Sequence, residues 1–278
     1  MTTLAHALAA AAALGLERLD AQLLLLHALG RAHDERAWLL AHHTDRLDAH
    51  REAAFFHMCT RRAAGEPLAY IVGRKEFFGL DLMVDRRVLV PRPETETLVE
   101  WALAVLPVTP NDSPLVVDLG TGSGAIALAI KKSRPDARVE ATDASADALA
   151  VAAANAQALS LEVLFRRGSW LADAFGPYDL IVGNPPYVAQ GDPHLDALAH
   201  EPLDALAAGP EGLHDIRTIV EQAPDRLARG GWLLLEHGWD QAAAVRRLLG
   251  EAGFRSVASR RDLAGIERCS GGQWLELG

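Results

Sequence analysis

The chain has 278 residues, half of them hydrophobic, which is enough for one large domain and one small domain with a substantial core. Its net charge is −10 with neutral histidines, so the bulk composition argues against extended binding to a phosphate backbone, although a local arginine patch could still contact RNA. Cys59 and Cys269 stand far apart without a Cys-x-x-Cys or Cys/His cluster, which argues against a metal site and a disulfide framework and favours a reducing cytoplasm.

The first 66 residues predict a small helical domain. Apolar residues recur at helical spacing from Leu19 to Leu29, and Gly30 follows as a stop signal, so we expect three to five short helices over residues 4–64. The Ala-rich start, Ala5 to Leu16, lacks Lys or Arg before its apolar run and reads as a helix, not a signal peptide. No apolar stretch approaches the length of a membrane-spanning helix. The histidines form no metal-binding pattern, so we expect them on the surface or in packing, and we expect the domain to recognise a partner.

Residues 67–93 predict a hairpin linker. Glycines punctuate two short apolar runs, Tyr70 to Val72 and Leu80 to Val84, which alternate like paired strands.

The Pro91 to Glu96 loop follows, stiffened by two prolines, and Thr95 is placed to cap a helix over Thr97 to Leu106. Two interpretations stay open. The loop either connects two domains or walls an active site, with Arg92 or Glu94 contacting a ligand.

Residues 94–278 predict a doubly wound α/β domain. A strand over Leu115 to Leu119 leads into a glycine-rich loop, a helix over Ala125 to Lys132 and a strand over Arg138 to Thr142. Glycines let the backbone approach a ligand closely, and Asp143 is placed to hold ribose hydroxyls. The loop residues predicted to contact an adenosyl ligand are Gly120, Thr121, Gly122, Ser123 and Gly124.

The spacing of this loop leaves two ligands open. Dehydrogenase fingerprints place a third glycine where this chain has Ala125, which some of them tolerate, whereas Gly-x-Gly-x-Gly preceded by Asp118 favours a different adenosyl ligand. The strand over Leu161 to Arg166 ends before Trp170, which either stacks near an adenine or packs in the core. The connection from Gln190 to Pro210 is either a lid or a surface excursion. Further elements bring the sheet to about seven strands: helices over 147–159, 213–227 and 241–249, and strands over 179–183, 232–236, 256–259 and 273–277.

The turn after strand 179–183 is where we place the chemistry. Pro185 and Pro186 lack N–H groups and restrict the residues before them, so the turn is stiff and poor in donors. The carbonyls of Asn184 and Pro185 and the Asn184 side-chain oxygen are then available as acceptors, and Tyr187 offers a flat face. Such a site suits a planar NH2 group, although an Asn-Pro-Pro sequence alone often marks only a tight turn.

Together, these motifs resemble class I S-adenosylmethionine-dependent methyltransferases whose Asn-Pro-Pro-Tyr motif methylates a planar nitrogen. Their common elements in this chain are Asp118 to Gly124, Asp143 and Gly183 to Tyr187. Three stretches are similar to the peptide chain release factor N5-glutamine methyltransferases: Gly65 to Gly73, Pro91 to Glu96 and Gly183 to Val188. The resemblance implies a seven-stranded Rossmann-like methyltransferase sheet joined to the helical domain by the hairpin linker.

The resemblance also implies a reaction, the N5-methylation of the glutamine in the Gly-Gly-Gln motif of translation release factors, with S-adenosylhomocysteine as the second product. It assigns Gly120 to Gly124, Asp143 and Trp170 to the cofactor and Asn184, Pro185, Pro186 and Tyr187 to the substrate amide, with Asn184 bordering both ligands. The expected mechanism is an in-line attack of the amide nitrogen on the sulfonium methyl, in which Asn184, Pro185 and Tyr187 hold the amide.

Two rivals remain at this stage. An adenine-N6 methyltransferase acting on DNA or RNA could use the same acceptor turn after base flipping, but the acidic charge and the lack of a target-recognition module count against it. A non-catalytic ribosome-associated protein would have no need of exposed acceptors. The chain also contains Gly271-Gly272-Gln273, which we expect to be a coincidence within a C-terminal strand.

Overall fold

The chain divides into two compact units, residues 1–74 and 75–278, in a computed structural model that describes residues 2–107, 113–172, 174–193, 195 and 198–275. The linker predicted over residues 67–93 is therefore divided between the units at Arg74. None of the described helices is long and apolar enough to cross a membrane.

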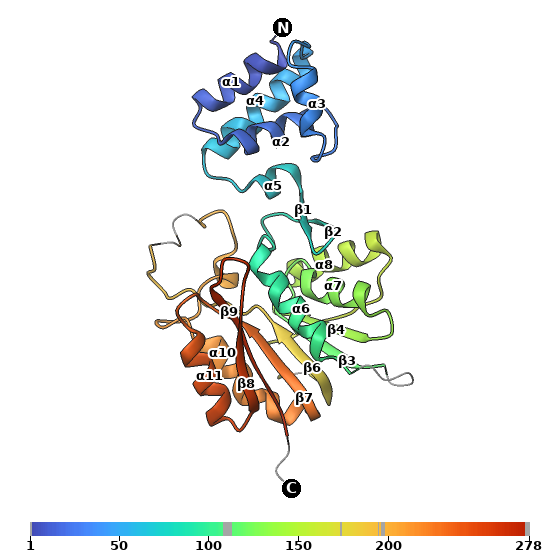
Figure 1. The fold of residues 1–278 in the computed structure, drawn as a ribbon, viewed down its shortest axis with the longest axis vertical. Helices are drawn as coiled ribbons and strands as arrows, with labels where there is room; N and C mark the ends of the chain where they lie inside the picture. The colour runs from blue at the N-terminus through green and yellow to red at the C-terminus, as the bar shows by residue number, and fades with distance from the viewer. Residues whose placement is uncertain (1, 108–112, 173, 194, 196–197, 276–278) are drawn as a thin grey trace. The chain divides into compact units, whose positions relative to one another are not determined.

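The first unit is helical, as predicted (Figure 1). The side chains of Thr3 and Asp48 cap the first and fourth helices, and Gly30, with φ +69°, follows the end of the second. Its core includes the fully buried Leu24 and Phe55. The helices are α1 (Leu4–Ala13), α2 (Arg18–Ala28), α3 (Arg36–Ala41), α4 (Ala49–Ala63) and α5 (Leu68–Val72).

Helix α5 corrects the strand predicted over Tyr70 to Val72. Pro67 precedes the helix, and Gly73, with φ +73°, ends it. Ile71 and Val72 are buried in the core of the first unit. A short apolar run of this kind does not distinguish a buried strand from a buried helical turn, because periodicity needs more residues than five.

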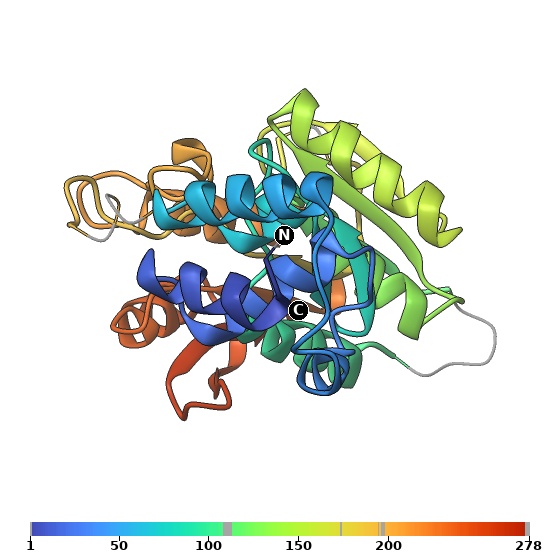
Figure 2. The same cartoon turned by 90° about the horizontal axis from the view of Figure 1, so that it is seen from above.

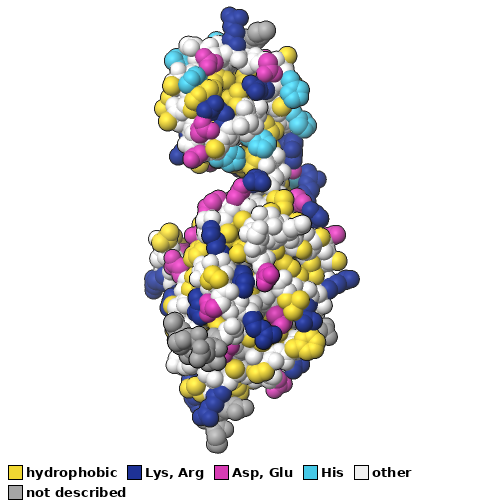
Figure 3. All heavy atoms as spheres, turned by 90° about the vertical axis from the view of Figure 1, so that its right-hand side faces the viewer, with side chains coloured by type: hydrophobic (Ala, Val, Ile, Leu, Met, Phe, Trp, Pro, Cys, Tyr) yellow, Lys and Arg dark blue, Asp and Glu magenta, His cyan; other side chains and the backbone are white. Residues whose placement is uncertain are grey.

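The histidines of the first unit lie mostly at its surface, as expected. Several can be seen as a scatter of imidazole rings in Figure 3. His27, His33, His43, His50 and His57 are exposed. Cys59, in this unit, and Cys269, in the second, are both buried and free.

A hairpin follows α5 and leads into the second unit, with β1 (Arg74–Phe77) in place of the strand predicted over Tyr70 to Val72, and β2 (Leu80–Met83) within the run predicted over Leu80 to Val84. Phe77, Leu80 and Leu82 are buried in the same core cluster as the helices of this unit.

The central sheet of the second unit has seven strands in the order β5-β4-β3-β6-β7-β9-β8, which confirms the predicted fold class. The five strands from β5 to β7 are parallel, whereas β9 runs antiparallel to β7 and β8. The strands are β3 (Leu115–Leu119), β4 (Arg138–Asp143), β5 (Leu164–Arg167), β6 (Tyr178–Gly183), β7 (Leu227–Glu236), β8 (Arg255–Arg261) and β9 (Glu267–Gln273).

Helices cover both faces of this sheet (Figures 1 and 2). Successive residues of the buried strands point to opposite faces, so that Leu180 and Val182 pack with one set of helices and Ile181 with the other. The first set comprises α6 (Glu96–Val105), α7 (Ala125–Ser133) and α8 (Ala146–Leu159), and the second comprises α10 (His214–Gln222) and α11 (Ala242–Glu251).

Three boundary predictions are wrong. Thr95 does not cap a helix. It is the last residue of a 3-10 turn, η1 (Pro93–Thr95), its backbone is in helical conformation, and its side chain makes no capping hydrogen bond. Helix α10 stops at Gln222 because Pro224 restricts the residue before it and imposes a 3-10 turn. The last strand is β9 and not residues 273–277, of which 276 and 277 lie outside the described residues.

Gly271 lies where the sheet leaves no room for a side chain. A Cβ atom there would lie 2.6 Å from the carbonyl oxygen of Leu233 and would also collide with the side chain of Leu234. We predict that Gly271→Ala lowers the free energy of unfolding by about 1–3 kcal/mol in urea denaturation, because the tightly packed sheet must shift. Gly250→Ala is the control, since no atom lies within 4 Å of its Cβ in α11, and it should stabilise by up to about 1 kcal/mol. Equal stability of Gly271→Ala and the wild type would contradict the packing argument.

Candidate active site

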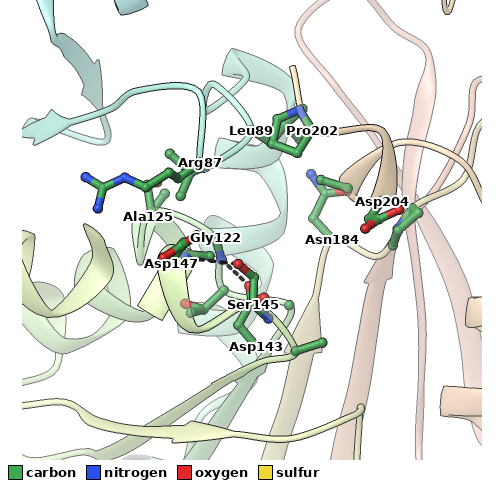
Figure 4. A pocket seen from close by; sticks show the side chains of 18 of the residues that line it. Arg87, Leu89, Gly122, Ala125, Asp143, Ser145, Asp147, Asn184, Pro202 and Asp204 are labelled. Atoms are coloured by element: carbon green, nitrogen blue, oxygen red, sulfur yellow. Dashed lines mark hydrogen bonds between the residues drawn. The ribbon is translucent and has the colours of Figure 1, made fainter. Parts of the chain in front are cut away.

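The second unit has a cavity of about 760 Å³ at the carboxyl ends of its parallel strands, where open α/β sheets bind ligands. Figure 4 shows Gly122, Asp143 and Ser145 on one side of this cavity and Asn184 and Asp204 on another. The walls come from the segments after β3, β4, β5 and β6, from the loop after the hairpin and from the connection after β6. The lining residues include Gly120–Ser123, Asp143–Ala148, Arg167–Trp170, Asn184, Pro186, Arg87–Leu89, Pro91, Arg92, Pro202, Asp204 and Ala205.

The glycine loop turns sharply after β3. Gly120 and Gly122 have φ values of +66° and +56°, which other residues rarely adopt, and the Gly122 N–H donates to Asp143 Oδ2 at 2.9 Å. Gly120 through Ser123 line the cavity, and their contact with a cofactor stays a prediction. Gly124 does not line it. It lies behind the loop, where an added Cβ would be 3.3 Å from Ala152 of α8, so this glycine serves the packing of α7 on α8.

Asp143 is held in a fixed orientation at the end of β4. Its Oδ2 accepts from Gly122, and its Oδ1 accepts from the N–H of Ser145 at 2.9 Å. Each carboxylate oxygen can accept more than one hydrogen bond, so this residue can still bind hydroxyl groups in the cavity.

Trp170 both lines the cavity and packs against the core. Its contact with an adenine stays a prediction. Its backbone has φ +51°, and its Nε1 donates to Asp215 Oδ1 at 3.2 Å. A Cβ at Gly120 would lie 3.3 Å from the Trp170 ring. The ring therefore closes over the start of the glycine loop.

The turn after β6 presents unpaired acceptors. Asn184 Oδ1 is buried and has no hydrogen-bond partner, and among the described residues no N–H donates to the carbonyl of Asn184 or Pro185. Asn184 Nδ2 instead points to Thr95 Oγ1 at 3.5 Å. The close approach of β6 to β3 requires Gly183, because a Cβ there would lie 2.9 Å from the carbonyl oxygen of Leu119.

The residues of this turn differ in whether they line the cavity. Asn184 and Pro186 line the cavity, whereas Pro185 is buried and Tyr187 lies outside the lining. The Tyr187 hydroxyl donates to Glu236 Oε1 at 3.4 Å, and its carbonyl accepts from Gln241 Nε2 at 3.1 Å. Tyr187 therefore anchors the turn in this structure.

The connection after β6 supplies part of the cavity wall, since Pro202, Asp204 and Ala205 line the cavity. Glu201 is buried, accepts from the N–H of Val90 at 3.1 Å and forms an ion pair with Arg92. Arg92 lines the cavity and Glu94 does not, so the Pro91 to Glu96 loop does wall this site. Residues 194, 196 and 197 of the predicted lid lie outside the described residues.

Two buried carboxyl groups near the cavity have raised pKa values. Burial raises the pKa of Asp118 to about 7, although Thr121 Oγ1 (2.6 Å) and the N–H of Ala127 (3.2 Å) donate to its Oδ2. Burial likewise raises the pKa of Glu236, the last residue of β7, to about 7.

Glu236, Thr95 and Glu201 are the residues that sequence reasoning missed. The position of Glu236 at the end of a strand beside β6 is a signal that could have identified it, because strand ends meet at one sheet edge.

The arrangement combines a glycine-lined cavity with acceptor oxygens that lack donors. A buried acceptor without a hydrogen-bond partner is unfavourable. The presence of such acceptors at this site therefore indicates a ligand that donates hydrogen bonds. Asn184 and Pro186, the residues of this turn that line the cavity, carry no acidic or basic group, so the turn suits a reaction driven by positioning.

Comparisons with known proteins agree with this geometry. Residues 100–252 match the family model described as Methyltransferase small domain, and residues 2–73 match the PrmC N-terminal domain. A release factor glutamine methyltransferase of Bordetella pertussis is 51% identical over 262 residues, covering 93% of this chain and 95% of the relative. One from Xylella fastidiosa (strain Temecula1) is 50% identical over 271 residues, covering 96% and 97%. A methyltransferase from Pyrococcus furiosus has a similar fold, with a TM-score of 0.54 and 20% identity over 78% of this chain and 98% of its own.

We predict that Asp118 makes stability fall as pH rises. Its pKa is raised on folding, so folding is favoured while the group is protonated, and this contribution is lost as pH rises from about 4 towards about 7. Asp118→Asn removes the titration. The free energy of unfolding of the variant, relative to the wild type, should therefore increase between these pH values and level off above them, by about 1.4 kcal/mol for each unit of pKa difference. Urea denaturation at several pH values measures this, and a pH-independent difference would contradict it.

Proposed function

The chain belongs to the family of release factor glutamine methyltransferases, and we propose that it methylates the side-chain amide nitrogen (N5) of the glutamine in the Gly-Gly-Gln motif of translation release factors. It is a methyltransferase that uses S-adenosylmethionine and leaves S-adenosylhomocysteine as the second product. The observation that carries the proposal is Asn184, which lines the cavity and whose buried Oδ1 has no hydrogen-bond partner among the described residues.

The cavity fits an adenosyl ligand. The glycines of residues 120–123 expose backbone without side chains, Asp143 keeps free acceptor capacity for ribose hydroxyls, and the Trp170 ring offers an apolar surface for adenine. Gly124 would act indirectly, by setting the position of α7. When bound, S-adenosylmethionine supplies a methyl group on a positively charged sulfur, so the protein has no need to activate it further.

We propose that Asn184 and Pro185 orient the glutamine amide. A primary amide has two N–H groups, and the Asn184 Oδ1 and the Pro185 carbonyl offer two acceptors for them. When both hydrogens are held in fixed directions, the free face of the amide nitrogen points towards the methyl donor. The nitrogen would form one new bond to the methyl carbon as the carbon–sulfur bond breaks and leaves its electron pair on sulfur, and it would release one proton to water, which restores a neutral amide. Pro186 would complete the wall around the amide, and Tyr187 would keep the turn in place from behind.

An adenine-N6 methyltransferase remains the alternative that the turn alone would allow, because an exocyclic aromatic amine also presents two N–H groups. The relatives that cover nearly the whole chain favour glutamine. A net charge of −10 also favours a protein substrate over sequence-specific binding to nucleic acid, and release factors would place the enzyme in the cytoplasm.

Mass spectrometry of the Gly-Gly-Gln peptide tests the function directly. A release factor incubated with the enzyme and S-adenosylmethionine should gain one methyl group on the glutamine, whereas DNA and RNA incubated in parallel should gain none. Methylation of nucleic acid without methylation of the release factor would overturn the proposal.

We predict that Asn184→Ala abolishes methyl transfer but changes cofactor affinity by no more than about threefold, because the variant loses an acceptor for the substrate amide and leaves the glycine loop intact. Methyl transfer and calorimetric titration of the cofactor measure the two effects. Gln190→Ala, on the exposed part of the same connection, is the control and should retain activity. Comparable loss of activity and cofactor affinity in Asn184→Ala would show that the turn serves the fold or the cofactor alone.

A further inference from the structure

Glu236 is a buried carboxyl group that methyl transfer itself does not use. It ends β7, the strand that pairs with β6, and only 1% of its surface is exposed. Its Oε1 accepts from the Tyr187 hydroxyl at 3.4 Å, and its Oε2 has no hydrogen-bond partner among the described residues. It does not line the cavity, so it acts on the site only through its neighbours.

Two neighbours connect Glu236 to the acceptor turn. Tyr187 belongs to the turn itself, and Thr95 contributes a hydroxyl group that favours the ionised form of Glu236. The same Thr95 Oγ1 lies 3.5 Å from Asn184 Nδ2. Thr95 thus neighbours both the carboxyl group of Glu236 and the amide group of Asn184.

The direction of these contacts determines which end of the Asn184 amide faces the cavity. A hydroxyl group has one proton, so a Thr95 hydroxyl that points its proton towards a carboxylate presents lone pairs to Asn184. Those lone pairs match the Asn184 NH2 group. The opposite end, Oδ1, is then left as the free acceptor. A Thr95 proton directed at Asn184 would instead favour a rotated amide, whose NH2 would oppose the NH2 of the substrate.

We propose that Glu236 is a positioning residue that keeps the Asn184 oxygen available to the substrate amide by orienting the Thr95 hydroxyl, while it anchors Tyr187. This inference rests on the proposed function, in which Asn184 holds the glutamine amide. Glu236 itself touches neither substrate nor cofactor.

The charge of Glu236 depends on pH in the physiological range. Burial raises its pKa to about 7, and Glu94 raises it further, whereas Arg268 and the hydroxyl groups of Thr95 and Tyr187 lower it. Cys269, paired with Glu236 across β9, also faces it and has a raised pKa. The carboxylate is the form that orients Thr95, so methyl transfer should increase as pH rises through about 7.

Glu236→Gln tests the inference, because it keeps the shape and removes the charge. Under saturating substrates, its kcat should fall by about 100-fold, and the rise in kcat near pH 7 should disappear. Glu140→Gln is the matched control: Glu140 is a buried carboxyl group of the same sheet that accepts from the Tyr178 hydroxyl at 2.9 Å, away from the cavity. It should retain the kcat and pH profile of the wild type.

Thr95 provides an independent test if Glu236→Gln folds poorly. Thr95→Val removes the hydroxyl group and should lower kcat as Glu236→Gln does, whereas Thr95→Ser should restore at least half of the wild-type value. The double variant Thr95→Val/Glu236→Gln should be no worse than either single variant within about threefold, because both changes interrupt one connection.

Binding gives a readout besides activity. Calorimetry of a Gly-Gly-Gln peptide in the presence of S-adenosylhomocysteine should show weaker peptide binding to Glu236→Gln and Thr95→Val, with S-adenosylhomocysteine affinity unchanged within about twofold. Wild-type kcat, pH profile and peptide affinity in both variants would overturn the role of Glu236 while leaving the proposed function intact. Failure of the wild-type enzyme to methylate a release factor would instead overturn the proposed function.

Discussion

An acceptor oxygen without a donor is the feature on which the active site depends. Asn184 can keep its Oδ1 unpaired because the two prolines after it contribute no N–H groups. Its own amide nitrogen is directed to Thr95, and Gly183 lets the strand carry the turn close to β3. Each of these conditions is a property of the chain at that point. In the proposed reaction, the substrate amide would satisfy this unfavourable buried group.

Buried carboxyl groups are a second kind of unfavourable group that this fold tolerates. Asp118 and Glu236 are both buried at strand ends and both have a raised pKa, so the fold tolerates groups that burial disfavours. Glu201 differs, because it is buried with two partners, the N–H of Val90 and the guanidinium group of Arg92. Glu201 thereby holds the wall that the long connection after β6 forms beside the cavity.

Much of this architecture is predictable from local sequence. Alternating and helical periodicity predicts the order of the elements, and the glycine-rich loop and the Asn-Pro-Pro turn both contribute residues to the cavity. One error arises where a segment is too short for its periodicity to distinguish a helix from a strand, as in the five residues of α5. Contacts between distant residues were also beyond local patterns: Thr95 meets Asn184 across 89 residues, and Val90 meets Glu201 across 111. No pattern in either segment signals its partner, because tertiary packing alone brings them together.

The Gly271-Gly272-Gln273 segment has a consequence for how the enzyme distinguishes its target from itself. Gln273 pairs with Trp232 in the sheet, and its Nε2 donates to the carbonyl of Gly230 at 2.9 Å. The amide that a methyltransferase would need to grasp is thus already occupied, and the two glycines before it are flanked by strands on both sides. Recognition of such a tripeptide therefore depends on its being displayed on an accessible loop, and a methyl group found on Gln273 would identify molecules in which β9 had separated from β7.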